Sequence, residues 1–175
     1  MKLFAYGPAI LRLALAAVFA AHGAQKLFGV WGGGGVAETA TFFRAIGLDR
    51  PLAPAFEAIG IDPAAASSLL AILVAGLEFG GGLLLLLGFL TRWVAVLLAL
   101  EMGVAAYAVH LPHGFFLNWA NAPGLGHGVE MSLALIGGLV CLIFTGAGAL
   151  SIDGWRQASE EEAALGRARL RSKVH

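Results

Sequence analysis

Ionisable side chains interrupt the apolar stretches of this 175-residue chain and are its most informative feature. An ionisable group in the middle of a bilayer costs roughly 3 kcal/mol unless it meets a partner, water or a bundle interior. The groups concerned are Arg12, His22, Lys26, Glu78, Glu101, His110, His127 and Glu130. In membrane segments such residues mark a functional site by default. The alternative is a salt-bridged polar core, with cations such as Arg12 and Lys26 paired to glutamates, that only fixes helix register.

Helical spacing places some of these groups on shared faces. His22 and Lys26 are four residues apart, about 40° around a helix axis, and Arg12 lies within about 80° of both. Glu101 and His110 are nine residues apart and fall on roughly opposite sides of a regular helix. They therefore serve different sites, unless the helix distorts before Pro112, which cannot continue it undisturbed.

Two chemistries fit these residue types. In the first, His22 or Glu78 exchanges protons with a quinone head group. The aromatic side chains expected around that head group are Phe19, Phe115 and Phe116. The second is metal binding by imidazole and carboxylate groups. The candidate metal ligands are His22, His110, His113 and His127, with Glu78 or Glu130.

The elements that must position these residues are membrane-spanning helices. Apolar residues make up 59% of the chain and charged residues 13%, and the mean hydropathy is +0.83. The runs lack the alternation of barrel strands, so we predict an all-α, integral membrane four-helix bundle. The predicted spans are residues 4–28, 64–90, 93–111 and 129–148, all within a transmembrane domain of residues 1–153. Recurrent glycines predict close helix packing, within one chain or between copies of a homo-oligomer.

The segments between and after the spans predict the orientation. Most loop cations outside the first loop fall on one side of this arrangement, whereas Arg44 and Arg50 lie on the other. The excess of cations predicts that both termini are cytoplasmic. In the long first loop, residues 36–46 form an amphipathic segment that we place along the outer surface. Residues 154–175 form a cytoplasmic tail, in which we expect a short exposed helix.

Several function classes are excluded. A net charge of zero argues against nucleic acid as a partner. The expected surrounding is the lipid bilayer. The single cysteine, Cys141, excludes an internal disulfide and a CxxC pair. The sequence has no P-loop, HExxH or GxSxG motif, so a self-contained enzyme of the soluble type is not expected.

Five stretches resemble the DoxX family of bacterial inner-membrane proteins, in the family's order. His22–Gly29 reads HGAQKLFG and is similar to the HGxxKLFG stretch near the end of that family's first span. The other matching stretches are Gly76–Arg92, His113–Phe116, Glu130 and Thr145–Asp153. Two departures are that the family often has Asn where His113 stands, and that the first loop is longer than in minimal members.

The resemblance implies four helices and a role in redox chemistry at the membrane. Members include a subunit of a thiosulfate:quinone oxidoreductase and partners of thiol-handling and superoxide-detoxifying proteins. By this likeness, the chain is expected to be an oxidoreductase subunit that passes electrons from a sulfur compound or thiol to quinone.

On this reading, the residues form one site in the outer half of the bundle. The predicted catalytic residues are His22, Glu78 and Lys26, with Lys26 stabilising a quinol oxyanion. The predicted quinone-binding residues are Arg12, His110, Glu130 and Phe115. The alternative function is a non-enzymatic anchor or assembly factor that recruits a soluble redox enzyme. Transport is a third class, against which four short helices without an inverted repeat argue.

Overall fold

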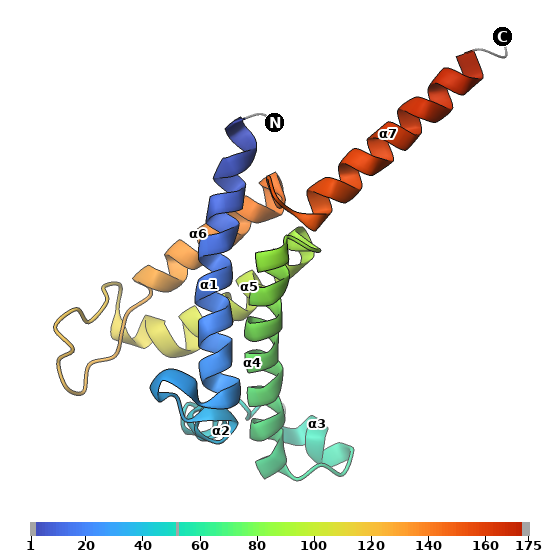
Figure 1. Cartoon of the computed structure of the whole chain (residues 1–175). Helices are drawn as coiled ribbons and strands as arrows, with labels where there is room; N and C mark the ends of the chain where they lie inside the picture. The colour runs from blue at the N-terminus through green and yellow to red at the C-terminus, as the bar shows by residue number, and fades with distance from the viewer. Residues whose placement is uncertain (1–2, 52, 173–175) are drawn as a thin grey trace.

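The computed structural model describes residues 3–51 and 53–172, and all the regular secondary structure in these ranges is helical (Figure 1). The prediction of an all-α chain is therefore confirmed. The long helices are α1 (Tyr6–Phe28), α4 (Pro63–Leu87), α5 (Thr91–Ala105), α6 (Glu130–Thr145) and α7 (Ile152–Ser172). The shorter ones are η1 (Leu3–Ala5), η2 (Val30–Gly32), α2 (Gly35–Ala45), α3 (Ala53–Ala58), η3 (Ala106–His110) and η4 (Leu111–His113).

Three helical segments are long and apolar enough to cross a membrane: Leu3–Phe28, Ala65–Leu87 and Thr91–His113. They correspond to the first three predicted spans. In the fourth, the apolar helix α6 has 16 residues and ends at Thr145 rather than residue 148. Its length of about 24 Å is less than the roughly 30 Å of a bilayer's hydrocarbon core. The chain is thus a helical membrane protein with three long apolar helices and a shorter fourth.

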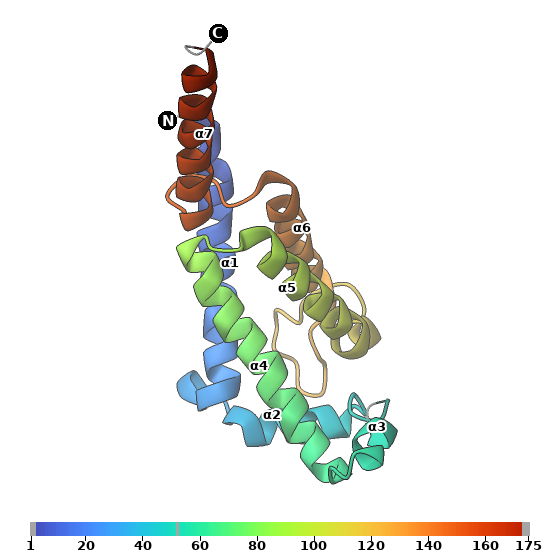
Figure 2. The ribbon, with the colours of Figure 1, turned by 90° about the vertical axis from the view of Figure 1, so that its right-hand side faces the viewer.

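Helices α1 and α4 lie side by side because glycines remove side chains from their contact (Figures 1 and 2). A Cβ atom on Gly23 would stand 2.2 Å from the backbone nitrogen of Phe79, and one on Gly82 would stand 2.5 Å from that of Ala20. Without large side chains at these points, the two backbones approach to a distance that only small residues permit. The predicted use of glycine for helix packing is confirmed here.

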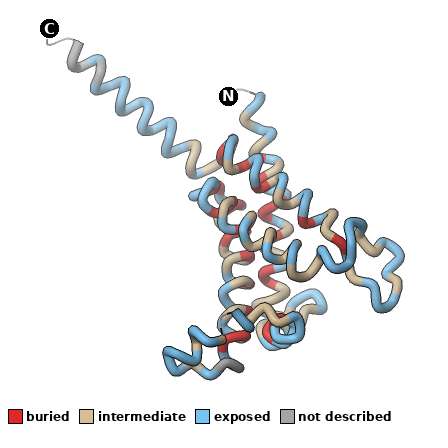
Figure 3. The backbone as a smooth tube through the Cα atoms, turned by 180° about the vertical axis from the view of Figure 1, so that it is seen from behind, coloured by how far each residue is buried: buried red, intermediate tan, exposed pale blue. Residues whose placement is uncertain are grey.

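The apolar core lies where α1, α4, α5 and α6 converge. Its buried members include Phe19 of α1, Leu85 of α4, Leu98 of α5 and Leu139 of α6. Figure 3 shows buried residues along the inner faces of these helices, with exposed residues on their outer sides. Exposed leucines are expected there, because lipid rather than water surrounds such a bundle.

Helices α4 and α5 separate from each other below the turn that joins them (Figure 2). The turn spans residues 88–90, and Leu90 has φ 53°. At the opposite end of α4, α2 packs across it, with Ala40 and Phe43 buried against Ala71. The predicted amphipathic segment of residues 36–46 is therefore a helix that presents one apolar face to α4.

Arg12 is buried at the end of the bundle that holds both termini. Its side chain is 1% exposed and donates hydrogen bonds to five backbone carbonyls. They belong to Ala147, Leu85, Leu86, Ala149 and Leu150. In the described structure Arg12 does not pair with a glutamate, as the polar-core alternative supposed, because its guanidinium donates to backbone carbonyls. Arg12 instead ties α1 to the end of α4 and to the segment before α7.

Helix α7 extends away from the bundle (Figures 1 and 3). The predicted short tail helix is thus a helix of 21 residues, Ile152–Ser172. Asp153 at its start accepts hydrogen bonds from the backbone nitrogens of Leu90 at 2.9 Å and Thr91 at 2.8 Å. The carboxylate thereby caps the first turn of α5 from a distant part of the sequence and complements its dipole.

Candidate functional site

An ion pair joins α1 to α4 close to the glycine contact. The ammonium group of Lys26 donates to the Oε1 atom of Glu78. Glu78 is 1% exposed, while the side chain of Lys26 keeps 31% of its exposure. Gly23 lies one turn before Lys26, and Phe79 follows Glu78, so the close approach of the helices brings the two charges together. The salt bridge between Lys26 and a glutamate, which the polar-core alternative required, is confirmed, with Glu78 as the partner.

Glu101 of α5 completes what we term the carboxylate–lysine cluster, which consists of Lys26, Glu78 and Glu101. Both Lys26 and Glu78 lie close enough to Glu101 to act on it electrostatically. One buried oxygen of each carboxylate, Oε2 of Glu78 and Oε2 of Glu101, has no hydrogen-bond partner in the described structure. Lys26 pairs with Glu78, and the carboxyl groups of Glu78 and Glu101 lie within hydrogen-bonding reach of each other.

A cavity of about 980 Å³ opens on one side of the cluster. We call it the lateral cavity, because it lies between α4 and α5 where these helices separate. Its walls come from α1, the glycine run before α2, and α2, α4 and α5. Apolar side chains predominate, and several are also exposed on the outside of the bundle: Leu73, Leu97, Leu100 and Val104. The cavity therefore faces the surroundings of the bundle through an apolar opening.

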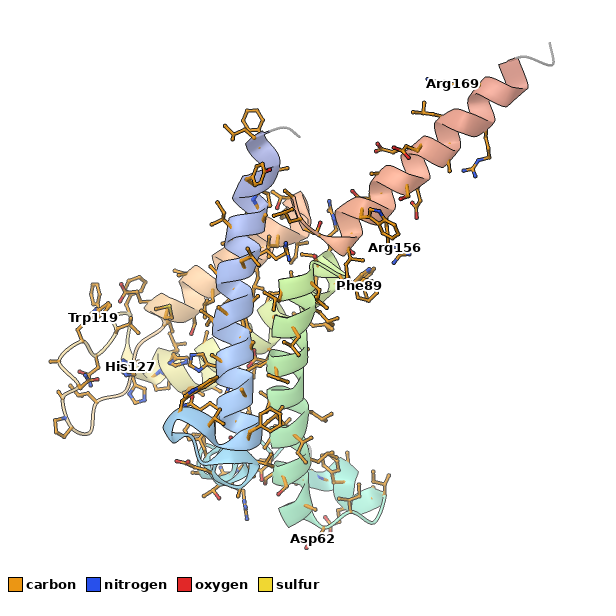
Figure 4. The ribbon with its side chains drawn as sticks, viewed as in Figure 1. Asp62, Phe89, Trp119, His127, Arg156 and Arg169 are labelled. Atoms are coloured by element: carbon orange, nitrogen blue, oxygen red, sulfur yellow. The ribbon has the colours of Figure 1, made fainter. Side chains whose placement is uncertain are left out.

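A second cavity of about 420 Å³ lies on the other side of the cluster. We call it the loop cavity, because residues 117–128 of the connection between η4 and α6 form one wall. Figure 4 shows His127 and Trp119 on this connection, at the side of the bundle. Glu78 lines the loop cavity, whereas His22, Lys26, Glu101 and His110 line both cavities. The polar cluster is thus the partition between two spaces.

A local change of helix type explains how Glu101 and His110 reach the same place. The chain runs as an α-helix to Ala105 and then as a π-helix over Ala106–His110. A π-helical turn holds an extra residue, which rotates the following positions by about 100° relative to a regular helix. The prediction that these two residues serve different sites is wrong, and the alternative of a distortion before Pro112 is confirmed.

Hydrogen bonds define the tautomers that the neutral histidines of the loop cavity adopt. The Nδ1 atom of His110 lies 3.0 Å from the backbone oxygen of His127, so it must carry a hydrogen. The Nδ1 atom of His127 accepts a hydrogen bond of 3.2 Å from the backbone nitrogen of Asn118. A neutral His127 therefore carries its hydrogen on Nε2, and a neutral His110 has a free acceptor at Nε2.

The other residues predicted for the site lie apart from the cluster. Arg12 is held by carbonyls ten residues before His22 on α1, about 15 Å along the helix. Glu130 lines neither cavity, and its Oε2 atom accepts a hydrogen bond of 3.1 Å from the backbone nitrogen of Leu117. Phe115 is 50% exposed, packs on Phe116 and also lines neither cavity. Phe19 lines the loop cavity but not the lateral cavity.

The described residues include no group of three or more His, Cys, Asp or Glu side chains placed to hold a metal ion. The group that the predicted site omits is Glu101. A charged residue within an apolar run indicates that Glu101 belongs to a site, but regular helix geometry places Glu101 and His110 on opposite sides of the helix.

Comparison with known proteins gives two relatives and one family model. Residues 7–111 match the model of the DoxX family. The chain is 41% identical over 81 residues to inner membrane protein YqjF of Escherichia coli (strain K12), covering 46% of this chain and 57% of that protein. It is 35% identical over 114 residues to uncharacterized membrane protein Rv3486 of Mycobacterium tuberculosis (strain ATCC 25618 / H37Rv), covering 63% of this chain and 67% of that protein. No solved structure gives a significant match.

Proposed function

Because the chain belongs to the DoxX family of membrane proteins, we propose that it is the membrane subunit of a quinone-linked oxidoreductase. It is a multi-pass protein of the inner membrane. The observation that carries the proposal is the position of the carboxylate–lysine cluster between two cavities. Buried ionisable groups are costly among membrane helices, and they persist where function needs them.

The lateral cavity suits a quinone in size and lining. Its volume of about 980 Å³ lies at the upper end of the range for small-molecule sites, about 300–1,000 Å³. An apolar tail would lie along Leu97, Leu100 and Val104, while the head group would meet the polar end of the cavity. His22, Lys26, Glu101 and His110 are among the polar residues that line the cavity.

The polar end has the groups that quinone reduction requires. A quinone that gains two electrons and two protons becomes a quinol, and a pair of thiols that loses the same number forms one disulfide. His22, together with Glu78 behind Lys26, would exchange the protons. Lys26 would stabilise negative charge that develops on the quinone oxygen, because Glu78 fixes its ammonium group in place.

The proposal includes an orientation in the bilayer. Helix α6 is the fourth span, and the termini face the cytoplasm. In support, Arg92 follows the turn at the end that holds the termini, and Arg156 and Arg167 lie on α7 beyond it, whereas Arg44 and Arg50 lie at the opposite end. The limited length of α6 requires a local thinning of the bilayer or a connection that reaches inward.

Analysis of the purified protein for bound quinone tests the function. Ultraviolet difference spectra and mass spectrometry should detect quinone in the detergent-solubilised protein. His22→Ala and Glu78→Gln should each lower the quinone content severalfold and abolish quinone reduction, without loss of membrane insertion. The matched controls are His113→Ala and Glu161→Gln, whose side chains line neither cavity. Equal quinone content in all four variants would refute the roles of His22 and Glu78.

A second candidate function is an anchor for a soluble redox enzyme, favoured by the exposed helix α7 (Figure 1). It predicts that the chain has no activity alone and that α7 binds the partner. Reversing the charges of the acidic turn, with Glu160, Glu161 and Glu162 all changed to Lys, should then abolish co-purification of a soluble redox protein. Quinone reduction by the isolated chain would eliminate this candidate.

A further inference from the structure

The loop cavity is lined by both carboxylates of the cluster, and one of them, Glu78, has no place in the lining of the lateral cavity. Glu78 lines this cavity and not the lateral one, and its Oε2 atom is buried without a hydrogen-bond partner. The Oε2 atom of Glu101 is in the same state. Unsatisfied buried acceptors are rare in folded proteins, because each costs about 1–3 kcal/mol. A proton held between the two carboxyl groups, which lie within hydrogen-bonding reach of each other, satisfies one acceptor, and a molecule in the loop cavity that donates a hydrogen bond would satisfy the other.

We propose that the loop cavity is a second binding site, separate from the lateral cavity. Its ligand is a small molecule, uncharged or cationic, that carries N–H, O–H or S–H groups. The volume of about 420 Å³ accommodates such a molecule together with water.

The polar lining complements this class of ligand. Besides the two free carboxylate oxygens, the cavity contains the side chains of Lys26, His127 and Ser132. The Nε2–H group of neutral His127 is a free donor, because its Nδ1 atom already accepts from Asn118. A ligand with both donors and acceptors therefore finds partners on the helices and on the loop.

The charges of the lining select against anions. Two carboxylates face one ammonium group, and Glu78 already binds that ammonium group. The other titratable groups of the lining are His22, His110 and His127, and no arginine is present among its residues. An oxyanion would place its own acceptor atoms beside the carboxylate oxygens of Glu78 and Glu101, and acceptors without a hydrogen between them repel each other in a partly buried space.

The route into the loop cavity differs from the opening of the lateral cavity. Residues 114–128 have irregular backbone, which does not lie against hydrocarbon because its polar groups would lack partners. This wall of the loop cavity therefore faces water or protein, whereas the lateral cavity opens among apolar side chains. If the chain reduces quinone as proposed above, the loop cavity is where a water-soluble reductant would bind. The binding itself does not depend on quinone.

Labelling of a cysteine in the loop cavity with two reagents of opposite charge tests the proposal. Ser132 lines the loop cavity and is 3% exposed, so Ser132→Cys in a Cys141→Ser background provides a thiol there. The full chain in nanodiscs is treated with cationic aminoethyl methanethiosulfonate or anionic sulfonatoethyl methanethiosulfonate. The labelling rate of each reagent at position 132 is divided by its labelling rate at Ser159→Cys on exposed α7, which corrects for the reactivity of the reagent itself. The corrected rate with the cationic reagent should be at least about tenfold higher, and Glu78→Gln should reduce this ratio severalfold.

Three outcomes would overturn the proposal: equal corrected rates, faster reaction with the anionic reagent, or no reaction at position 132 while position 159 reacts. Should Ser132→Cys fail to fold, Leu135→Cys probes the same cavity. Quinone content is measured on the same samples. Charge selection without bound quinone would support the loop site and count against the quinone function alone, so the two failures can be told apart.

Discussion

Lys26 of α1 donates its ammonium hydrogen to one carboxylate oxygen of Glu78 on α4, while the other oxygen of Glu78 is buried without a partner. The ion pair therefore joins the two most closely packed helices and leaves a free acceptor beside a cavity. Substitutions can separate the contribution of this ion pair to protein stability from its contribution to the proposed site.

Removing Lys26 should destabilise the bundle more than removing both charges. Lys26→Met leaves the carboxylate of Glu78 buried and uncompensated, at a cost of about 2–3 kcal/mol. This is below the range for a wholly buried pair, because the Lys26 side chain is 31% exposed. Adding Glu78→Gln to Lys26→Met should restore part of the loss. Thermal unfolding in detergent measures both effects, and a double variant less stable than Lys26→Met would contradict the pairing.

Arg12→Met should destabilise the protein by at least about 3 kcal/mol, since five buried or partly buried carbonyls lose their donor. The quinone content per folded molecule should stay unchanged, because Arg12 lines neither cavity. The measurements are the melting temperature and the quinone content at a temperature where the variant is folded. Loss of quinone from folded Arg12→Met would restore Arg12 to the site.

Asp153→Ala should loosen the first turn of α5. The two carboxylate oxygens accept from the backbone nitrogens of Leu90 and Thr91, and loss of such a cap costs about 1–2 kcal/mol. Hydrogen exchange at residues 90–92 should accelerate, while exchange in α1 should change much less. Glu161→Ala on exposed α7 is the control. Unchanged exchange at residues 90–92 would show that the cap is not needed.

Gly23→Ala should lower the melting temperature, whereas Gly76→Ala should not. A Cβ atom on Gly23 would overlap the backbone of Phe79, and overpacking of this kind costs about 1–3 kcal/mol. Gly76 lies on α4 as well, but a Cβ atom there meets nothing within 4 Å. The two variants make the same chemical change, so equal melting temperatures would rule out the close contact of α1 and α4.

The sequence allows the helical class and three of the long helices to be predicted, because apolar runs of this length have few alternatives in a membrane. The Lys26–Glu78 pair is also accessible to prediction, since both charges must find partners. The role of Arg12 is not, because backbone carbonyls offer no sequence signal. The same holds for Asp153, whose partners are backbone nitrogens 63 and 62 residues away.

The meeting of Glu101 and His110 lies beyond a periodicity argument for a different reason. Regular helix geometry sends them to opposite sides, and only the π-helical turn at Ala106–His110 brings both to the cavities. Pro112 indicates that the helix is disturbed, but not by how many degrees it rotates. The positions of charged residues in the sequence therefore indicate which residues belong to the site, but helical spacing does not show which of them lie together.

The carbonyl cage around Arg12 has a consequence for biosynthesis. Ala147 follows Arg12 by 135 residues, so at about 5–20 residues per second its carbonyl is made roughly 7 to 27 s after the arginine. Throughout that interval the first helix has a cation whose final partners include residues not yet translated. Until then these bonds cannot fix the position of α1 in the bilayer, and the segment between α6 and α7 completes them when it is made.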